Sequence, residues 1–294
     1  STAVTIGGHE SLGSMAIYLA GTEEQKTKYL VPLAEGKKLA TYALTEAGAG
    51  SDAGGIKTIA EKAGNGYILN GSKTFITNGD LADVIVAFVL TDPEKRTHGG
   101  ITAFIVEKEW QGFRAGKPER KMGIRGSHTT DLFFENVQVP QENILGGIGN
   151  GFKVAMETLD VARVSLSAQC LGSAKEMLDL SIKHASQRVQ FGKPIAEQQA
   201  IQLMLADMAG DIYQVESIIY RTARVIDESL AGQLTNGRSY SRESAICKIA
   251  ATEMVCTVAD KAMQIHGGMG YMRDYPIERF YRDARINRIF EGTN

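Results

Sequence analysis

The pattern of hydrophobic and polar positions changes twice along the chain and divides it into three stretches. Residues 1–38 are helical in pattern, because the apolar run SMAIYLA is followed by a Gly-Thr stop and an acidic restart. From residue 39 to about residue 140, short β-rich runs are separated by Gly, Asn, Asp and Pro. After that, apolar residues recur at every third or fourth position, which predicts long helices that face a core.

The β-rich runs of the second stretch share a short length and a turn residue at each end. They are TYALTEA, GYILNGSKTFITNG, VIVAFVLT, ITAFIVEK and TTDLFFENVQV. No helical pattern of 10–15 residues lies between them, so strands joined through helices are not expected. We therefore predict an antiparallel β-sandwich or β-barrel.

Helical spacing is clearest between Gln198 and Leu230. The positions that carry it are Ile201, Leu205, Met208, Ile212, Val215, Ile219, Thr222 and Ile226. Residues 154–187 and 242–265 follow the same spacing, and FGKPI and AGQLTNGRS provide the breaks. Long helices joined by short links predict an up-and-down bundle. We expect helical residues at 1–38, a β-domain at 39–148 and a helical bundle at 149–294.

Composition excludes several classes of protein. A net charge of −2 on 294 residues does not favour a polyanionic partner such as nucleic acid. No apolar run approaches the length of about 18 residues that a membrane span needs. The cysteines, Cys170, Cys247 and Cys256, lack the spacing of a metal site and are expected to be buried thiols. His266 has no second ligand at metal-binding spacing, so no metal is expected.

Two stretches of the β-domain are candidates for binding, although each has an ordinary structural explanation. LTEAGAGSD leaves a predicted strand with free N–H groups, and it either holds an anion or the polar edge of a ring, or is a plain β-turn. It lacks the glycine spacing of a dinucleotide-binding motif. KTFITNG places Phe75 and Thr77 on one face of a strand, where they either flank a planar cofactor or form part of the core and its edge.

The helical part holds three further candidates. Arg188 in QRVQFGKPI either meets a phosphate or is solvated. Gly267 and Gly268 in MQIHGGMGY either cap a helix or let the backbone approach a ligand closely. The chain ends on RIFEGTN, where the single carboxylate of Glu291 stands between an aromatic residue and a glycine.

The order of these blocks resembles that of the acyl-CoA dehydrogenase family of flavoproteins. The matching blocks are YALTEAGAGSD, GYILNGSKTFITNG, KMGIRGSHTTDLFFENVQVP, RVQFGKPI, IHGGMGY and RIFEGTN, and they span essentially the whole chain. The resemblance implies an α+β multidomain fold with a helical N-terminal domain, a middle β-domain and a C-terminal four-helix bundle. It also implies that residues 1–38 are the end of the first domain and that the chain stops before the final helix of the bundle.

The resemblance implies FAD as the cofactor. The positions that match flavin-binding residues of the same subunit are Tyr42, Leu44, Thr45, Gly50 and Ser51, with Phe75 and Thr77 against the isoalloxazine ring and Thr293 as a further contact. The positions that match residues gripping the FAD of a neighbouring subunit are Arg188, Phe191, Gln199, Gln264 and Gly268. Ala47 stands where the family usually has proline, which loosens the turn without removing a ligand.

The family introduces an α,β-double bond into an acyl-CoA thioester, and the resemblance assigns the catalytic base to Glu291. The base removes the α-proton while a hydride leaves the β-carbon for the flavin. A second position for the base in the family corresponds here to Ala162, which cannot take a proton. The positions that match substrate-binding residues are Ser51, Arg163, Phe290 and Gly292.

The resemblance thus implies a dehydrogenase of fatty-acid β-oxidation that passes electrons to an electron-transfer flavoprotein and forms a homotetramer. An enoyl-CoA reductase of the same fold and a non-catalytic flavoprotein scaffold are the alternatives. An acyl-CoA oxidase is less favoured, because those chains usually carry a further domain. The expected compartment is the cytoplasm of a bacterium or the mitochondrial matrix of a eukaryote.

Acyl chain length is the remaining question at this level. Gly7 and Gly8 stand where short- and medium-chain relatives have bulkier or charged residues. Missing side chains would deepen the acyl pocket, and each extra buried methylene contributes up to about 0.8 kcal/mol. We therefore expect medium-to-long acyl chains.

Overall fold

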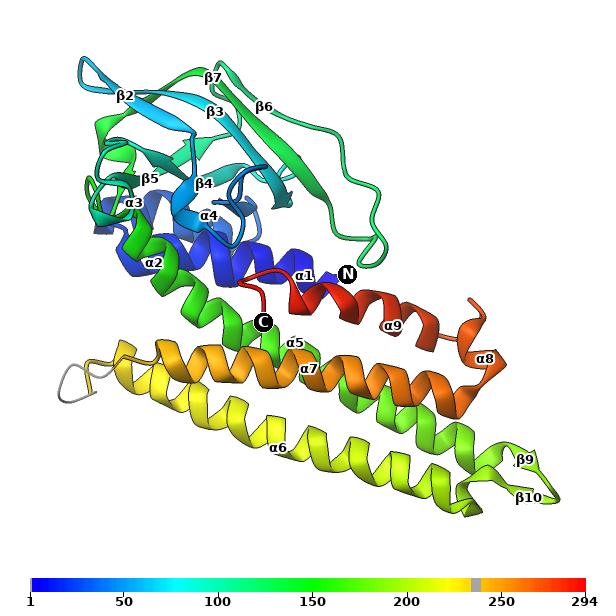
Figure 1. The fold of residues 1–294 in the computed structure, drawn as a ribbon. Helices are drawn as coiled ribbons and strands as arrows, with labels where there is room; N and C mark the ends of the chain where they lie inside the picture. Colours follow the sequence, from blue (N-terminus) through cyan, green and yellow to red (C-terminus); the bar gives the residue numbers. More distant parts are fainter. Residues whose placement is uncertain (1, 234–238) are drawn as a thin grey trace. The chain divides into compact units, whose positions relative to one another are not determined.

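The structure, a computed structural model, describes residues 2–233 and 239–294 and divides into two compact units (Figure 1). The first comprises Ser1–Lys121 and Arg125–Ala162, and the second comprises Met122–Ile124 and Arg163–Asn294. The predicted break AGQLTNGRS includes residues 234–238, which lie outside the described residues. The domain boundaries expected at 38/39 and 148/149 stay predictions.

The N-terminal residues of the first unit are helical, as expected. The segments are α1 (Thr2–Gly7), the π-helical η1 (Gly8–Ser14), α2 (Met15–Ala20), α3 (Glu23–Gln25), the π-helical η2 (Lys26–Leu30) and α4 (Val31–Ala34). Thr22 and Gln25 form a capping box, because each side chain accepts a hydrogen bond from the backbone N–H of the other. This reciprocal cap satisfies orphan N–H groups of the new helix. It confirms the predicted stop and restart.

The β-domain of the first unit is one eight-stranded sheet. Its strands are β1 (Ala40–Ala43), β2 (Ile59–Ala63), β3 (Gly66–Thr77), β4 (Val84–Leu90), β5 (Ile101–Glu107), β6 (Phe113–Ala115), β7 (Thr129–Pro140) and β8 (Ile144–Leu145). Short 3₁₀ turns lie at Ala53–Gly55, Arg96–His98 and Gln141–Asn143. The strand order is β6-β7-β3-β2-β4-β5-β8, and β1 pairs with β4.

The expectation of a purely antiparallel sheet is wrong at two pairings. β1 runs parallel to β4 over four residue pairs, and β2 pairs with β4 in parallel through Ile59 and Leu90. A parallel pair needs a long crossover connection. Here the β2–β3 hairpin, rather than a helix, supplies that length, so no helical pattern marked it in the sequence. The remaining pairings of this sheet are antiparallel.

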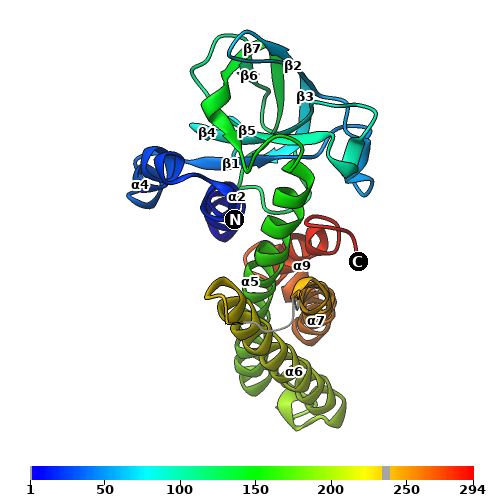
Figure 2. The same cartoon turned by 90° about the vertical axis from the view of Figure 1, so that its left-hand side faces the viewer.

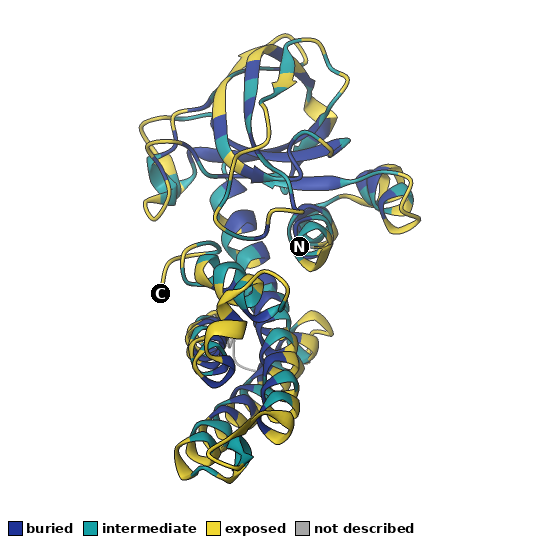
Figure 3. Cartoon of the chain, turned by 90° about the vertical axis from the view of Figure 1, so that its right-hand side faces the viewer, coloured by how far each residue is buried: buried dark blue, intermediate teal, exposed yellow. Residues whose placement is uncertain are grey.

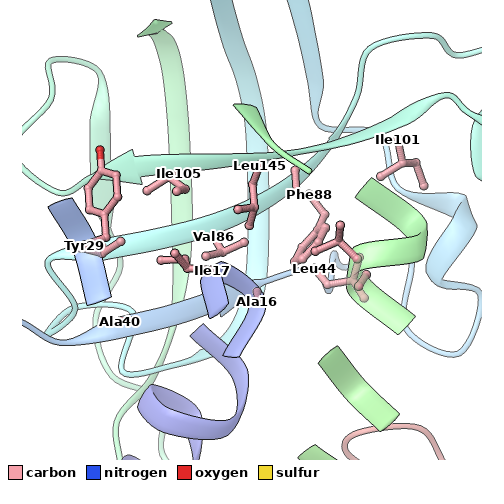
Figure 4. Close-up of a cluster of buried hydrophobic side chains, with 14 of the residues drawn as sticks. Ala16, Ile17, Tyr29, Ala40, Leu44, Val86, Phe88, Ile101, Ile105 and Leu145 are labelled. Atoms are coloured by element: carbon pink, nitrogen blue, oxygen red, sulfur yellow. The ribbon is translucent and has the colours of Figure 1, made fainter. Parts of the chain in front are cut away.

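The sheet curls so that β3 and β7 share a core with β4 and β5, which confirms the expected sandwich or barrel (Figure 2). Every residue of β4 is buried, because its other face packs against N-terminal helices and the start of α5 (Figures 3 and 4). Ile17 and Tyr29 from those helices belong to the same core cluster as Val86 and Phe88. Burial on both faces explains why VIVAFVL is continuously apolar rather than alternating.

The second unit is built on long helices. These are α5 (Gly151–Gln187), whose residues from 163 onward belong to this unit, α6 (Gln199–Leu230) and α7 (Ser241–His266). α6 and α7 lie side by side (Figures 1 and 2). Six of the eight positions predicted to face the core of α6 are buried. The helical spacing therefore gave both the extent and the buried face of this helix.

Short elements connect and follow these helices. They are β9 (Val189–Gln190), β10 (Lys193–Pro194), a 3₁₀ turn at Ile195–Glu197, α8 (Gly268–Tyr271), α9 (Ile277–Ala284) and the 3₁₀ turn η7 (Arg285–Arg288).

The segment Met122–Ile124 packs against α9, where the Ile124 N–H donates to Asp283 Oδ1 at 2.5 Å and Arg282 donates to the Met122 carbonyl at 2.9 Å.

Candidate active site

The LTEAGAGSD stretch of the first unit is a closed turn at the end of β1. Glu46 and Ala49 exchange two backbone hydrogen bonds, at 3.0 and 3.1 Å. Ala47 is exposed between them, so the alanine in place of the family's proline leaves the turn closed. Leu44 belongs to the core, whereas Gly50 and Ser51 are exposed. The predicted turn is confirmed, and its binding role stays a proposal.

A buried ion pair ties this turn to strand β3. Lys73 Nζ donates to Glu46 Oε1 at 2.7 Å and to the Leu44 carbonyl at 3.2 Å. The Glu46 carboxylate also accepts the backbone N–H groups of Lys57 at 2.6 Å and of Thr58 at 3.0 Å. Buried charges are tolerated when they are paired and fully hydrogen-bonded. The pair therefore fixes three chain segments around the turn.

The charge state of this pair follows from its partners. Burial by itself raises the pKa of Glu46, but the Lys73 ammonium and the donated hydrogen bonds outweigh it, so the pKa lies below its ordinary value. Burial lowers the pKa of Lys73 to about 8, against the opposing effect of Glu46. Both groups are therefore charged at pH 7.

Phe75 occupies a strained position in β3. The register of β3 against β7 shifts between Lys73 and Ile76, which marks a β-bulge. Phe75 has a φ of +57° and its side chain is 66% exposed. A positive φ is rare for a bulky residue and is concentrated at functional sites. Phe75 and Thr77 flank the buried Ile76, although the bulge interrupts the regular alternation that the prediction assumed, and the Thr74 N–H donates to the Thr45 carbonyl at 2.9 Å.

Tyr42 lies beneath this region in β1. Its hydroxyl donates to the Ala155 carbonyl at 3.1 Å, and its ring packs on Phe88 with centroids 4.6 Å apart. The Thr77 carbonyl accepts a hydrogen bond from the Thr41 hydroxyl at 2.6 Å. The structure thus brings Tyr42, Leu44, Thr45, Phe75 and Thr77 to adjoining strand ends of the first unit.

In the second unit, Phe191 stands at the tip of the β9–β10 hairpin. Phe191 and Gly192 have φ values of +55° and +78°, which fit the two central residues of a type I′ turn. Asn, Asp or Gly is usual at the first of these positions. Phe191 is 96% exposed, so the strain holds an aromatic ring in solvent. Arg188 is exposed at the base of the same hairpin and makes no ion pair with any described residue.

The other residues predicted to meet a neighbouring subunit's FAD lie around this corner. Gln199 is exposed as the first residue of α6, and Gln264 is exposed in the last turn of α7. Gly268 is exposed as the first residue of α8, and a Cβ there would meet no other atom within 4 Å. The rings of His184 and His266 stack at 4.4 Å between centroids, which joins the end of α5 to the end of α7. The structure therefore gathers these residues at one end of the unit.

Glu291 lies in a loop that follows η7 and contains no helix or strand. Glu291 and Gly292 have φ values of +54° and +95°. The Glu291 carbonyl accepts a hydrogen bond from Arg163 Nε at 3.1 Å, and Lys248 Nζ donates to the Gly292 carbonyl. A Cβ on residue 292 would lie 3.2 Å from Arg163 Nη2. Glycine is required there because of its φ and its closeness to the guanidinium.

One oxygen of the Glu291 carboxyl group is buried and has no hydrogen-bond partner among the described residues. This atom is Oε2, and the residue as a whole is half-buried. Burial raises the pKa of Glu291 to about 7, and the positive charges of Lys248 and Arg163 oppose this rise. A carboxyl group with a pKa near neutrality is suited to general-base catalysis.

Three other predicted residues share the loop of Glu291. Phe290 is half-buried and Gly292 and Thr293 are exposed in the same loop, and the Thr293 hydroxyl donates to the Arg288 carbonyl at 3.4 Å. Ala162, at the alternative position for a base, is buried in α5. Glu46, Lys73 and Lys248 were not predicted from the sequence. The signal that could have found them is a charged residue at a position where the periodic pattern requires an apolar one.

The structure gives no indication of a metal site or of a membrane span. Within residues 2–233 and 239–294, no cluster of three or more His, Cys, Asp or Glu side chains is arranged to hold a metal ion. No helix in the described part of the chain has both the length and the apolar character of a membrane span. All three cysteines are free thiols, and Cys256 is only partly buried, which departs from the expectation for that residue.

Comparison with known proteins identifies the family. Three family models match in chain order: the N-terminal domain of acyl-CoA dehydrogenase at residues 1–37, the middle domain at 41–137 and the C-terminal domain at 149–294. An acyl-CoA dehydrogenase of Bacillus subtilis is 46% identical over 291 residues, which are 99% of this chain and 74% of that protein. The chain belongs to the acyl-CoA dehydrogenase family.

Two further relatives of this acyl-CoA dehydrogenase family member are reductases by name. Acryloyl-CoA reductase (NADH) of Anaerotignum propionicum is 48% identical, with 96% of this chain and 70% of that protein covered. A caffeyl-CoA reductase-Etf complex subunit of Acetobacterium woodii is 45% identical, with 99% and 74% covered. Both directions of the reaction are therefore represented among similar proteins.

Solved structures agree with the fold and the cofactor. Butyryl-CoA dehydrogenase from Megasphaera elsdenii superposes with a TM-score of 0.94 at 46% identity, over 99% of this chain and 74% of that one. An acyl-CoA dehydrogenase from Bacillus anthracis in complex with FAD gives a TM-score of 0.91 at 44% identity, over 99% and 51%. The expected fold, the enzyme class of FAD-dependent acyl-CoA dehydrogenase and FAD as the cofactor are confirmed. The roles of single residues stay proposals.

Proposed function

We propose that the protein dehydrogenates a short acyl-CoA thioester between its α- and β-carbons, with Glu291 as the base that removes the α-proton. The observation that carries this proposal is the buried Oε2 atom of Glu291, which has no hydrogen-bond partner among the described residues, in a loop held by two cationic side chains. A thioester α-proton is very weakly acidic, so its removal needs a base placed in a site that excludes water. Glu291 is suited to act as that base because its pKa is about 7.

The residues of the first unit fit the flat ring system of a flavin. Phe75 presents an aromatic ring to solvent at the cost of a strained backbone, and Thr77 is partly buried two residues further along the strand. We propose that these residues, with Tyr42, Leu44 and Thr45, hold the FAD ring, and that Gly50 and Ser51 contact it through the exposed part of the turn. When bound, FAD accepts the hydride that leaves the β-carbon.

Residues of the second unit would remove the α-proton and stabilise the enolate that develops. Glu291 accepts the α-proton at its carboxylate, which must be ionised beforehand, so the rate rises with pH through the pKa of about 7. The Glu291 carbonyl is engaged by Arg163, which fixes the orientation of the peptide plane next to the base. We propose that the backbone N–H of Glu291 faces the thioester oxygen, where negative charge develops, and that Phe290 and Gly292 shape the space beside it.

Short acyl chains are the substrates that we propose, in place of the medium-to-long chains expected from Gly7 and Gly8. A Cβ on residue 8 would lie 2.9 Å from Thr77 Cγ2, so the missing side chain of Gly8 serves a close helix–sheet contact. The names of a butyryl-CoA dehydrogenase and of short-chain-specific relatives support the same choice. The test is anaerobic titration of the flavoprotein with acyl-CoAs of increasing length. Faster bleaching by a twelve-carbon than by a four-carbon substrate would restore the earlier expectation.

An electron-transfer flavoprotein is the proposed redox partner. The support is the relative that bears the name of a reductase-Etf complex. The reverse reaction, reduction of an enoyl-CoA, is the second candidate, since relatives at 45–48% identity are named as reductases. The flavin potential, together with turnover of butyryl-CoA and of crotonyl-CoA, separates the two directions. If the enzyme turns over neither substrate while retaining FAD, the scaffold alternative replaces both.

A homotetramer is the proposed assembly. The support is the exposed Phe191 and the exposed Arg188 at one end of the helical unit, where the cation has no ion-pair partner among the described residues. Arg188→Ala should weaken FAD retention while helical content is unchanged, and Lys183→Ala, at an exposed cation of α5, which ends just before Arg188, should retain FAD. A monomer that binds FAD stoichiometrically would contradict the proposal.

The base itself is tested by Glu291→Gln, which retains the shape of the side chain and removes the proton acceptor. We expect FAD and acyl-CoA to stay bound, and the rate of flavin reduction by butyryl-CoA to fall by about 100- to 10,000-fold. Stopped-flow absorbance of the flavin measures this rate. Glu135→Gln, at a glutamate that is 66% exposed, is the matched control. If Glu291→Gln reduces its flavin within tenfold of the parent rate, Glu291 is not the base.

A further inference from the structure

Lys248 is a buried lysine that takes part in no chemical step of the proposed reaction. It lies in α7 and is only 2% exposed. Its ammonium group donates to the Gly292 carbonyl and, at 2.7 Å, to Asn294 Oδ1. Burying a cation costs free energy unless polar groups surround it. Both acceptors of this cation belong to the loop that carries Glu291, so the function of Lys248 must concern that loop.

No carboxylate neutralises Lys248 directly. Within residues 2–233 and 239–294 it forms no ion pair, and its two partners are neutral oxygen atoms. On the same helix, Lys261 shows the ordinary arrangement, a surface ion pair with Asp207 at 2.9 Å. Burial lowers the pKa of Lys248, and the charge of Glu291 opposes that effect. The positive charge of Lys248 is therefore free to act on the nearby carboxyl group.

The two peptide groups that follow Glu291 are held by cations, and the end of the loop is held by neutral donors and by Glu253. Arg163 Nε holds the Glu291 carbonyl, and Lys248 Nζ holds the next carbonyl along the chain. Asn294 is held further by Thr252, through hydrogen bonds of 2.8 and 3.2 Å. Two successive carbonyl groups are thus bound by cations from two different helices, α5 and α7. This arrangement fixes the peptide between a base with a φ of +54° and a glycine with a φ of +95°.

We propose that Lys248 is a positioning residue for the base: it holds the loop through the Gly292 carbonyl and Asn294, and its charge favours the ionised form of Glu291. The proposal rests on the assignment of Glu291 as the base. Lys248 itself touches neither substrate nor cofactor in this scheme. Its contribution is to hold the carboxylate in place and to keep it available at neutral pH.

Several other charged and titratable groups surround the loop, and their effects on Glu291 must be distinguished from that of Lys248. The groups on α5 are Arg163 and Cys170, those on α7 are Glu253 and Cys256, and those on η7 are Arg285 and Arg288. Arg288 pairs with Glu253 at 2.5 Å, so these two charges offset each other. Burial strongly raises the pKa of the Cys170 thiol, which leaves it neutral. Arg163 and Lys248 are thus the two cations that favour the carboxylate.

Three substitutions of Lys248 separate its hydrogen bonds from its charge. Lys248→Met removes both, Lys248→Gln keeps a donor without the charge, and Lys248→Arg keeps the charge. The measurement is the rate of flavin reduction by butyryl-CoA from pH 5.5 to 9 in single-turnover experiments, with FAD content and helical content determined in parallel. Lys261→Met is the matched control, because it removes a surface lysine from the same helix.

We expect the pH midpoint of the reduction rate to move upward by about one pH unit in Lys248→Met and Lys248→Gln, because loss of a nearby cation disfavours the carboxylate. The plateau rate of Lys248→Met should fall by up to about 100-fold, because a small misplacement of a reacting group has an effect of this size. Lys248→Gln should lose less of the plateau rate, Lys248→Arg should restore the midpoint, and Lys261→Met should match the parent.

A pH midpoint that is unchanged in both Lys248→Gln and Lys248→Met overturns the proposal, and any loss of rate is then structural. Should Lys248→Met fail to fold, Lys248→Gln and Lys248→Arg decide between the outcomes by their midpoints. Glu291→Gln keeps the two proposals apart. If that variant reduces flavin at the parent rate, the proposed base is wrong. If it is inactive while the Lys248 variants keep the parent midpoint, only the role of Lys248 is wrong.

Discussion

Glu46 in the β-domain and Glu291 in the helical unit are both withdrawn from solvent, but their surroundings differ. Glu46 accepts hydrogen bonds from an ammonium group and from two backbone N–H groups, and its pKa is lowered. Glu291 has an oxygen without any partner among the described residues, and its pKa is raised to about 7. The same side chain therefore serves as a structural anion in one place and as a proton acceptor in the other. The number of donors that reach each carboxylate decides which.

The largest effect that sharpens this comparison is expected from Glu46→Gln. It leaves the Lys73 ammonium buried without its counter-ion, and breaking a buried ion pair costs about 3–5 kcal/mol. Chemical denaturation at pH 7 measures the loss, and FAD retention should fall with it. Glu135→Gln breaks an exposed pair and should change the free energy of unfolding by less than about 1 kcal/mol.

The double variant Glu46→Gln/Lys73→Met provides the corresponding control, because it removes both charges together. We expect it to recover most of the stability that Glu46→Gln loses. Loss of Glu46 lowers the pKa of Lys73 further, since Glu46 is the group that opposes the effect of burial, so the destabilisation by Glu46→Gln alone should shrink as the pH rises towards about 8 and the unpaired lysine gives up its proton. A loss that does not depend on pH would indicate a packing defect in place of an unpaired charge.

Unlike Glu46→Gln, Glu291→Gln should increase the free energy of unfolding. A pKa raised from 4.5 to about 7 means that the folded state disfavours the carboxylate, so this group costs stability as the pH rises from 4.5 through 7. The difference corresponds to about 3 kcal/mol. The variant should therefore be more stable than the parent by up to that amount at pH 8 and by little at pH 4.5. Thermal denaturation of the apoprotein across this range measures it, and equal gains at both pH values would contradict the unpartnered state of Glu291.

Gly292→Ala should show a smaller loss. Its φ of +95° disfavours any side chain, and the new Cβ would crowd Arg163, so we expect a cost of about 1–2 kcal/mol. Flavin reduction should slow as well, because the hydrogen bond from Arg163 to the Glu291 carbonyl is disturbed. Gly210→Ala, in an exposed helical position with open space around it, should leave the rate unchanged and stabilise slightly. If both substitutions had equal effects, the positive φ of Gly292 and its closeness to Arg163 would not matter for stability or for the rate.

The smallest effect is expected in the loss of stability at acidic pH, where Glu46 becomes protonated. The pKa of Glu46 is lowered in the folded state, so its contribution to stability is complete above about 4.5 and is lost as the pH falls below that value. The double variant Glu46→Gln/Lys73→Met should therefore lose less stability than the parent between pH 4.5 and pH 3. Parallel acid denaturation curves for the two proteins would show that Glu46 is not ionised in the folded parent.

Sequence periodicity predicted the elements well where one face of an element is buried. α6 begins and ends within a residue of the expected range, and the core strands coincide with the β-rich runs. The short strands β2, β6 and β8 were missed, because two to five residues carry too little pattern. The parallel pairing of β1 with β4 was also missed, since alternation along a strand carries no information about the direction of its neighbour.

By itself, the sequence determined the family, the order of helical and β-rich parts, and the candidates Glu291, Phe75 and Arg188, because local pattern and motif order are properties of the chain. Only the tertiary structure decided that Phe75, Phe191 and Glu291 all adopt a positive φ, and that Gly8 lies close to Thr77. It also decided that Lys73 and Lys248 are buried beside Glu46 and the Glu291 loop, 27 and 44 residues away from their partners Glu46 and Gly292. Protonation depends on burial and on neighbouring charges, and those neighbours are brought together by folding rather than by position in the chain.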